Sequence, residues 1–170
     1  MNPEIDVTIE SDLWAVLEAP EALAEKAIFA CVRETKAKLP KGAELSLLLC
    51  DDAAIRALNK QWLGKDEATN VLSFPSASPD AFEIPALIGD VVIAFETASR
   101  EAADEGKTLS DHVTHLIVHG FLHLLGYEHD SDAEAEEMER SERRILAQMG
   151  IADPYADSVP VRETVSDASP

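Results

Sequence analysis

Residues 112–129, HVTHLIVHGFLHLLGYEH, contain all five histidines of this 170-residue chain. Three of them, His119, His123 and His129, form the pattern H-x3-H-x5-H. Residues four apart in a helix lie one turn above the other on the same face, so His119 and His123 can present two imidazole nitrogens to one ion. Gly126 is suited to end that helix, after which the chain can fold back and bring His129 to the same point.

This donor set is typical of one kind of metal site. Three neutral imidazole nitrogens with one position left for water indicate a catalytic zinc site, because structural sites use four protein ligands, commonly cysteines. A single buried histidine is more often a packing residue, but core packing does not explain five histidines within eighteen consecutive positions. The pattern predicts one zinc ion per chain, held by His119, His123 and His129, with a metal-bound water as the catalytic group.

The two remaining histidines of the stretch carry weaker predictions. His115 lies one turn before His119 on the same stripe, so we expect either a hydrogen-bond partner of a metal ligand or an ordinary buried histidine. His112 is expected to be solvated.

Length and composition restrict the class of protein. The chain is long enough for one domain with one core, and 46% hydrophobic with 28% charged residues is typical of a soluble globular protein. The apolar runs are too short to cross a bilayer, and the N-terminus has no signal-peptide pattern. We therefore expect a cytoplasmic protein with no membrane partner, in which Cys31 and Cys50 are reduced, buried packing residues.

The formal net charge of −19 argues against a nucleic-acid partner, because phosphate contacts need a basic surface, and no DNA partner is expected. The charges are unevenly distributed, however. Half of the fourteen basic residues lie between positions 33 and 65, and acidic residues crowd positions 128–142. This distribution fits either a basic edge on an acidic body or ordinary solvated helix faces.

Hydrophobic periodicity predicts an α+β fold. Strands are expected at 5–9, 44–50, 70–75 and 87–95, and helices at 20–39, 52–63, 96–105, 110–125 and 132–149. The apolar run at 44–50 indicates a central strand, and the short link 75–87 indicates an antiparallel pair. We predict a single domain, residues 1–151, with a mixed sheet of about four strands packed with helices, followed by a disordered acidic tail, residues 152–170.

Gly120 restricts the chemistry that the histidines can support. Zinc peptidases carry H-E-x-x-H, in which the glutamate after the first histidine is the general base, whereas here Gly120 follows His119. A metal ion with an open position lowers the pKa of bound water towards 7 and polarises a substrate oxygen, which suits hydrolysis of a phosphodiester or a carbonyl compound. A different zinc hydrolase, a peptidase or amidase, is an alternative that Gly120 disfavours.

The segment HGFLHLLGYEH, residues 119–129, resembles the H-G-x-L-H-L-x-G-Y-D-H signature of the YbeY endoribonucleases, which are bacterial ribosomal RNA maturation factors. LNKQWLGKDEATNVLSFP, residues 58–75, and LIGDVVIA, residues 87–94, are similar to two further segments of that family, and the resemblance covers roughly residues 45–147. The resemblance implies a metal-hydrolase fold and zinc coordination by His119, His123 and His129.

The same resemblance implies a function and partners. It implies cleavage of single-stranded RNA in maturation of the small-subunit (16S) ribosomal RNA and in ribosome quality control. The expected partners are ribosomal RNA and the small ribosomal subunit or its associated proteins.

The chain departs from the family pattern at two positions. Glu128 stands where the pattern has aspartate, and Leu63 where it has an arginine that, in the family, is thought to bind the phosphate in the metal cleft. A guanidinium aimed at developing charge is worth roughly 10²-fold or more in rate. Either Lys60, Lys65 or Arg56 compensates, or the protein is a metal-stabilised ribosome-docking factor with weak or no nuclease activity.

Four polar residues between positions 60 and 73 are candidate substrate contacts. Lys60 and Lys65 offer positive charge next to the family segment, and Asn70 and Ser73 flank the strand NVLSF. For Asn70 and Ser73, hydrogen bonding at a turn or a strand edge is an equally good interpretation.

Asp90 follows Gly89 in a strand that is otherwise apolar, so we expect a buried carboxylate in need of a partner. A histidine N–H, of His115 or of a metal ligand, is the natural one. Trp62 and Phe74 are expected to lie in the core or in a cleft wall rather than to stack on bases, because large aromatic side chains are usually buried.

Overall fold

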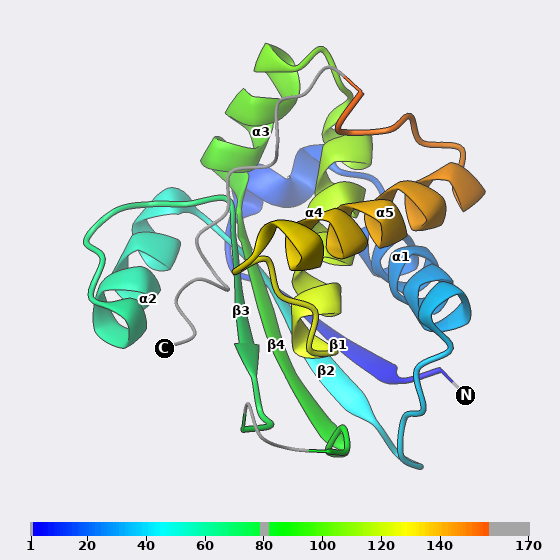
Figure 1. Cartoon of the computed structure of the whole chain (residues 1–170). Helices are drawn as coiled ribbons and strands as arrows, with labels where there is room; N and C mark the ends of the chain where they lie inside the picture. Colours follow the sequence, from blue (N-terminus) through cyan, green and yellow to red (C-terminus); the bar gives the residue numbers. More distant parts are fainter. Residues whose placement is uncertain (1, 79–81, 157–170) are drawn as a thin grey trace.

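The structure is a computed structural model that describes residues 2–78 and 82–156. The described residues form one four-stranded sheet of order β1-β2-β4-β3 (Figure 1). β1 and β4 run parallel to β2, and β3 runs antiparallel to β4. The strands are β1 (Glu4–Ile9), β2 (Glu44–Cys50), β3 (Val71–Pro75) and β4 (Leu87–Ala94). The predicted mixed sheet, the central place of β2 and the antiparallel β3–β4 pair are confirmed.

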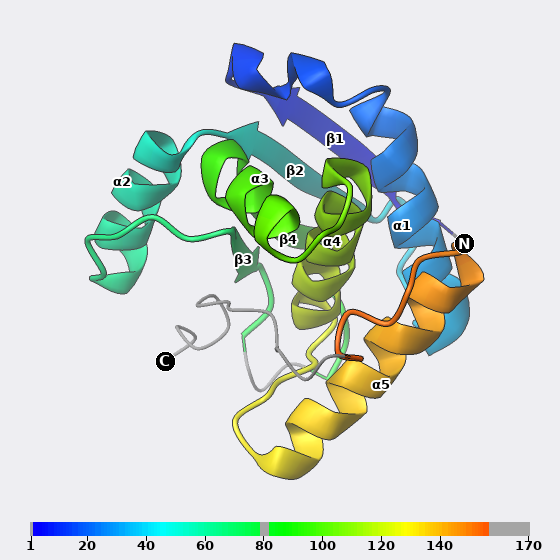
Figure 2. The same ribbon diagram turned by 90° about the horizontal axis from the view of Figure 1, so that it is seen from above.

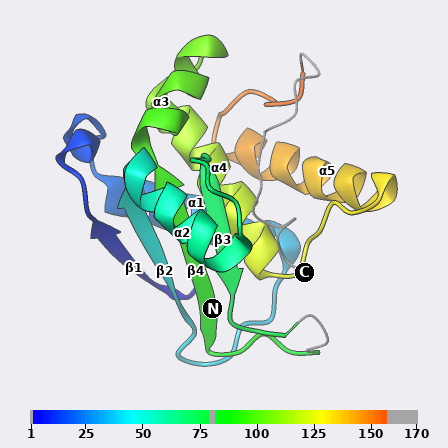
Figure 3. The same ribbon diagram turned by 90° about the vertical axis from the view of Figure 1, so that its left-hand side faces the viewer.

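The helices lie on both sides of this sheet. Seen from above, α1, α4 and α5 gather on one side and α2 lies on the other (Figure 2), and α2 stands in front of the sheet when its own side faces the viewer (Figure 3). They are η1 (Asp12–Val16, a 3-10 helix), α1 (Pro20–Thr35), α2 (Asp52–Leu63), α3 (Phe95–Asp104), α4 (Leu109–Leu124) and α5 (Asp132–Gln148). The predicted α+β class, with the histidines on a helix of the C-terminal half, is confirmed.

α4 is the central helix of the domain, and every residue from His112 to Leu124 is buried. A helix that is apolar on all sides needs neighbours on all sides, and α4 packs against β3, β4, α1, α3 and α5. It begins after Thr108, whose hydroxyl accepts a hydrogen bond from the Asp111 amide at 3.1 Å. It ends before Gly126, whose φ of +103° favours glycine, so the predicted helix end is confirmed.

α4 meets the sheet closely at Gly120. A Cβ atom on this residue would lie 2.8 Å from Cγ1 of Val91 and 3.1 Å from Oγ of Ser73. The Ser73 hydroxyl donates a hydrogen bond to the Gly120 carbonyl at 2.9 Å. The position that holds the general base in H-E-x-x-H peptidases is therefore occupied by the sheet, which gives a steric reason for glycine next to His119.

The core is continuous, and one prediction about it is borne out. Cys31 and Cys50 are buried free thiols, as predicted. Burial raises the pKa of the Cys31 thiol and, with nearby carboxylates, raises that of Cys50 to about 12. No helix within residues 2–78 and 82–156 is both long and apolar enough to cross a membrane.

The boundary between domain and tail needs a correction. Tyr155, which the sequence assigned to a disordered tail, donates a hydrogen bond from its hydroxyl to Oε1 of Glu142 at 2.8 Å and packs edge-on against the His115 ring. Residues 152–156 therefore contact the domain, because a buried carboxylate on α5 attracts the tyrosine hydroxyl. The rest of the predicted tail, residues 157–170, lies outside the described residues.

Candidate metal centre

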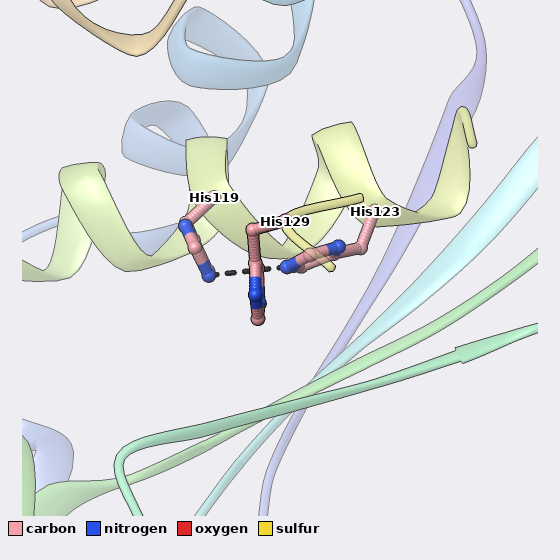
Figure 4. A group of neighbouring side chains, drawn as sticks. All are labelled: His119, His123 and His129. Atoms are coloured by element: carbon pink, nitrogen blue, oxygen red, sulfur yellow. Dashed lines mark hydrogen bonds between the residues drawn. The ribbon is translucent and has the colours of Figure 1, made fainter. Parts of the chain in front are cut away.

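The structure brings His119, His123 and His129 together as the sequence predicted. One ring nitrogen from each lies within 4.8 Å of the others, a geometry that can hold a metal ion. The two Nε2 atoms of His119 and His123 are 3.2 Å apart, and the His129 ring lies beside them, coming from the loop between α4 and α5 (Figure 4). The first two rings are buried and the third is half-buried.

The opposite nitrogens of the two helical histidines are engaged with acceptors. Nδ1 of His119 lies 3.0 Å from Oε2 of Glu142, and Nδ1 of His123 lies 2.8 Å from the carbonyl oxygen of Tyr127. A neutral imidazole has one N–H and one lone pair, so an Nδ1–H that donates to these oxygens places the lone pair on Nε2, the nitrogen directed at the other histidines. The donor set therefore fits a borderline-soft divalent ion such as zinc.

Glu142 is fully buried on α5 and joins three side chains. Its Oε1 accepts hydrogen bonds from Nε2–H of His115 at 2.6 Å and from the Tyr155 hydroxyl at 2.8 Å, and its Oε2 faces His119. Burial raises the pKa of the carboxyl, but its interactions with His119 and His115 lower the pKa by more, so the pKa of Glu142 lies well below its usual value. The three side chains that face its two oxygens are all able to donate, which is the surrounding of an accepting carboxylate.

Burial acts on His115 in the opposite sense. Removal from water lowers the pKa of His115 below its ordinary value, and this outweighs the hydrogen bond and the charge of Glu142. At neutral pH this imidazole is uncharged and donates Nε2–H to the carboxylate. Its Nδ1 has no hydrogen-bond partner among the described residues.

Sequence reasoning missed Glu142, although a signal was present. The acidic residues of 128–142 fitted either an acidic body or ordinary solvated helix faces, yet Glu142 lies on the buried stripe of α5, one turn after Met138 and one turn before Ile145. A glutamate on an apolar helix stripe needs a partner, and the histidine stripe of α4 provides two.

The prediction for Asp90 is wrong. Its side chain is exposed and lines an open hollow of about 590 Å³ with Trp62, on the face of the sheet that α2 partly covers. Its neighbour Val91 faces the opposite way, towards Gly120 on α4. Side chains alternate along a strand, so Asp90 points away from the histidines, and Glu142 is the carboxylate that contacts His115.

The prediction for His112 is also wrong, and two candidate substrate contacts are buried. His112 is fully buried, with Nε2 2.9 Å from Oε1 of Glu101, and the Asn70 amide donates to the same carboxylate at 3.0 Å. Ser73 is bonded to α4 through Gly120. These contacts favour the interpretation of Asn70 and Ser73 as residues that hydrogen-bond within the domain.

The other candidates lie on or next to α2, across the sheet from α4. Lys60 is exposed and Lys65 is half-buried, and Leu63, the last residue of α2, packs against the hydrophobic core. Trp62 is 64% exposed and lines the hollow beside α2, so of the two predicted places it takes the cleft wall and not the core. Phe74 is half-buried against the core, as predicted.

Fold and site together define a single-domain α+β protein with a three-histidine centre built on its central helix. The family model of Endoribonuclease YbeY matches residues 9–150. Endoribonuclease YbeY of Methylocella silvestris is 50% identical over 157 residues, which cover 92% of this chain and 88% of the relative. That of Azorhizobium caulinodans is 50% identical over 153 residues, 90% of this chain and 96% of the relative. The chain belongs to the YbeY family.

A solved structure supports the fold. The solution structure of a protein from Thermotoga maritima superposes with a TM-score of 0.54 at 23% identity, covering 94% of this chain and 99% of the other. At this identity the likeness concerns the fold alone.

Proposed function

We propose that this protein is a metal-dependent endoribonuclease that cleaves single-stranded RNA, with one zinc ion per chain bound by His119, His123 and His129. The observation that carries the proposal is the convergence of three imidazole nitrogens within 4.8 Å of one another, in a chain of the YbeY family. Relatives that are 50% identical over most of their length are named endoribonucleases.

The side chains around the three histidines fit a catalytic metal site. His119, His123 and His129 would hold a divalent ion without adding negative charge to it, and such an ion would polarise a phosphodiester oxygen and lower the pKa of water. Nδ1–H of His119 and of His123 is fixed by Glu142 and by the Tyr127 carbonyl, which holds both rings in one orientation. Val91 and Ser73 fill the space beside Gly120 and exclude a peptidase base.

The biological role that we propose follows the family. It is maturation of the small-subunit (16S) ribosomal RNA and ribosome quality control in the cytoplasm, with ribosomal RNA and the small subunit or its associated proteins as partners. Lys60, which is exposed, and Lys65, which is half-buried, are the proposed phosphate contacts, because they offer positive charge on a chain of net charge −19.

A ribosome-docking factor with weak nuclease activity is the second candidate, and Leu63 is the observation that favours it. Leu63 packs against the core at the position where the family pattern has arginine, so no guanidinium is offered from there. A loss of that group is worth roughly 10²-fold or more in rate.

One experiment separates the two candidates. Cleavage of a single-stranded RNA by zinc-loaded protein is compared between the native chain, His119→Ala and Leu63→Arg, with bound zinc quantified in each. We expect the native protein to bind one zinc ion and cut RNA, and His119→Ala to lose both. A native protein that binds zinc but cuts RNA only after Leu63→Arg would instead identify a docking factor.

A further inference from the structure

The carboxylate of Glu142 has an unusual set of neighbours for an acidic residue on a surface helix. It is fully buried, while four other acids of α5 are exposed or half-buried. These four are Glu134, Glu136, Glu137 and Glu139. Burying a carboxylate is costly unless hydrogen bonds compensate. Glu142 therefore does not serve, as exposed acids do, to keep the surface of α5 hydrated.

Three donors converge on this carboxylate from two different segments. His115 and His119 come from α4, at 2.6 Å and 3.0 Å, and the Tyr155 hydroxyl comes from the C-terminal turn at 2.8 Å. Tyr155 is itself held in place, because Arg143 lies over its ring at 5.5 Å and forms an ion pair with Asp153 at 3.2 Å. Oε1 thus has two donors, which leaves Oε2 directed at His119.

The contact between Oε2 of Glu142 and the His119 ring determines which nitrogen of His119 carries the proton. A carboxylate only accepts hydrogen bonds, so the nitrogen of His119 that faces Oε2 must carry the proton. The remaining nitrogen, Nε2, then has the lone pair and points to His123 and His129. The other tautomer would place a proton on Nε2 and block metal binding.

We infer that Glu142 is the positioning residue of the metal centre: it fixes His119 in the Nδ1–H tautomer, and Tyr155 from the C-terminal turn holds Glu142 in place. The inference rests on the proposed metal site and deepens it. A residue on the next helix and one near the C-terminal end of the described chain thus control a ligand on α4. A carboxylate partner also makes an imidazole a better donor to metal.

The test uses the full-length chain and two matched pairs of variants. Glu142→Ala removes the hydrogen-bond acceptor of His119. Glu142→Gln keeps the side-chain volume and one acceptor oxygen, so it should hold the His119 tautomer and the zinc affinity better than Glu142→Ala does. Glu136→Ala and Glu136→Gln are the controls, because Glu136 lies on the same helix with its side chain 73% exposed. Tyr155→Phe removes only the hydroxyl.

The first readout is the tautomer of His119 in metal-free protein, measured by long-range ¹H–¹⁵N NMR, which an 18.5 kDa chain allows. We expect Nδ1–H in the native chain and in both Glu136 variants, and a mixture of tautomers in Glu142→Ala. A purely structural role for Glu142 would leave the tautomer unchanged. The native tautomer in folded Glu142→Ala and Glu142→Gln would overturn the inference.

The second readout is zinc affinity, measured by competition with a chelator. We expect a loss of about 10- to 100-fold in Glu142→Ala, a smaller loss in Glu142→Gln, a severalfold loss in Tyr155→Phe and less than twofold in the Glu136 variants. Native affinity in both Glu142 variants would refute the positioning role, and native affinity in Tyr155→Phe would refute the part assigned to Tyr155. Failure of the proposed function is distinct, since it would appear as native protein that binds zinc but does not cut RNA.

Discussion

Replacing Gly120 with alanine tests the packing that places the histidine helix on the sheet. In an ordinary helix interior this substitution stabilises the protein by about 0.5–1 kcal/mol, because alanine loses less backbone entropy than glycine. At Gly120 the new methyl group would lie 2.8 Å from Cγ1 of Val91 and 3.1 Å from Oγ of Ser73. Both neighbours belong to strands and are buried, so neither can move aside freely.

Whether Gly120→Ala raises or lowers the free energy of unfolding depends on the balance between helix propensity and overpacking. Overpacking a well-packed core costs about 1–3 kcal/mol, which outweighs the gain in helix propensity. We expect Gly120→Ala to lower the free energy of unfolding by up to about 2 kcal/mol. The shift of α4 should also weaken the hydrogen bond of 2.9 Å from Ser73 to the Gly120 carbonyl.

The assay is urea unfolding of metal-free protein in a double-mutant cycle with Val91→Ala. Trimming Val91 removes the shortest contact, so Gly120→Ala should cost less in that background, with a coupling of at least about 1 kcal/mol between the two sites. Two results would refute the reasoning. The first is that Gly120→Ala, made in the native chain, raises the free energy of unfolding. The second is that the effects of Gly120→Ala and Val91→Ala add to within about 0.5 kcal/mol.

Three further perturbations have defined outcomes. Because burial raises the pKa of Cys31 and raises that of Cys50 to about 12, thiol reagents at pH 8 should label both only after unfolding; fast labelling of native protein would contradict this. Burial lowers the pKa of His115 in the folded protein, so below about pH 6.5 the unfolded state binds more protons than the folded state. The free energy of unfolding of metal-free protein should therefore fall from pH 7 to pH 5.5, and it should fall less steeply in His115→Gln. Equal slopes in both proteins would exclude His115 as the cause. Asp51 caps α2 by accepting from the Ala54 amide at 2.9 Å, so Asp51→Ala should lower the urea-derived free energy of unfolding by about 1 kcal/mol, and an unchanged midpoint would show that the cap contributes nothing.

Local spacing was enough to predict most of the fold and the three converging histidines. His119 and His123 are four apart on a helix, and Gly126 ends that helix where the left-handed conformation is needed. These are short-range constraints that a sequence shows directly. Glu142 was not predicted, because it lies 23 residues after His119 and reaches it only when α5 packs against α4.

The error at Asp90 has a different physical origin. The apolar residues around Asp90 predicted a buried carboxylate, but α2 covers only part of this face of the sheet, and Asp90 and Trp62 line the hollow beside it. Periodicity shows which residues share a face of a strand. It does not show how much of that face a helix will cover, since this depends on the length and tilt of the helix in the folded chain.

Four of the five histidines lie on one helix, yet their partners divide them into two pairs. His112 and His115 engage a carboxylate through Nε2, and Nδ1 of each stays buried with no hydrogen-bond partner among the described residues. His119 and His123 engage an acceptor through Nδ1, and their Nε2 atoms meet at 3.2 Å. The spacing of histidines therefore identifies the helix face, whereas acceptors outside α4, Glu142 and the Tyr127 carbonyl, engage Nδ1 of His119 and of His123 and leave Nε2 of each directed at the metal centre.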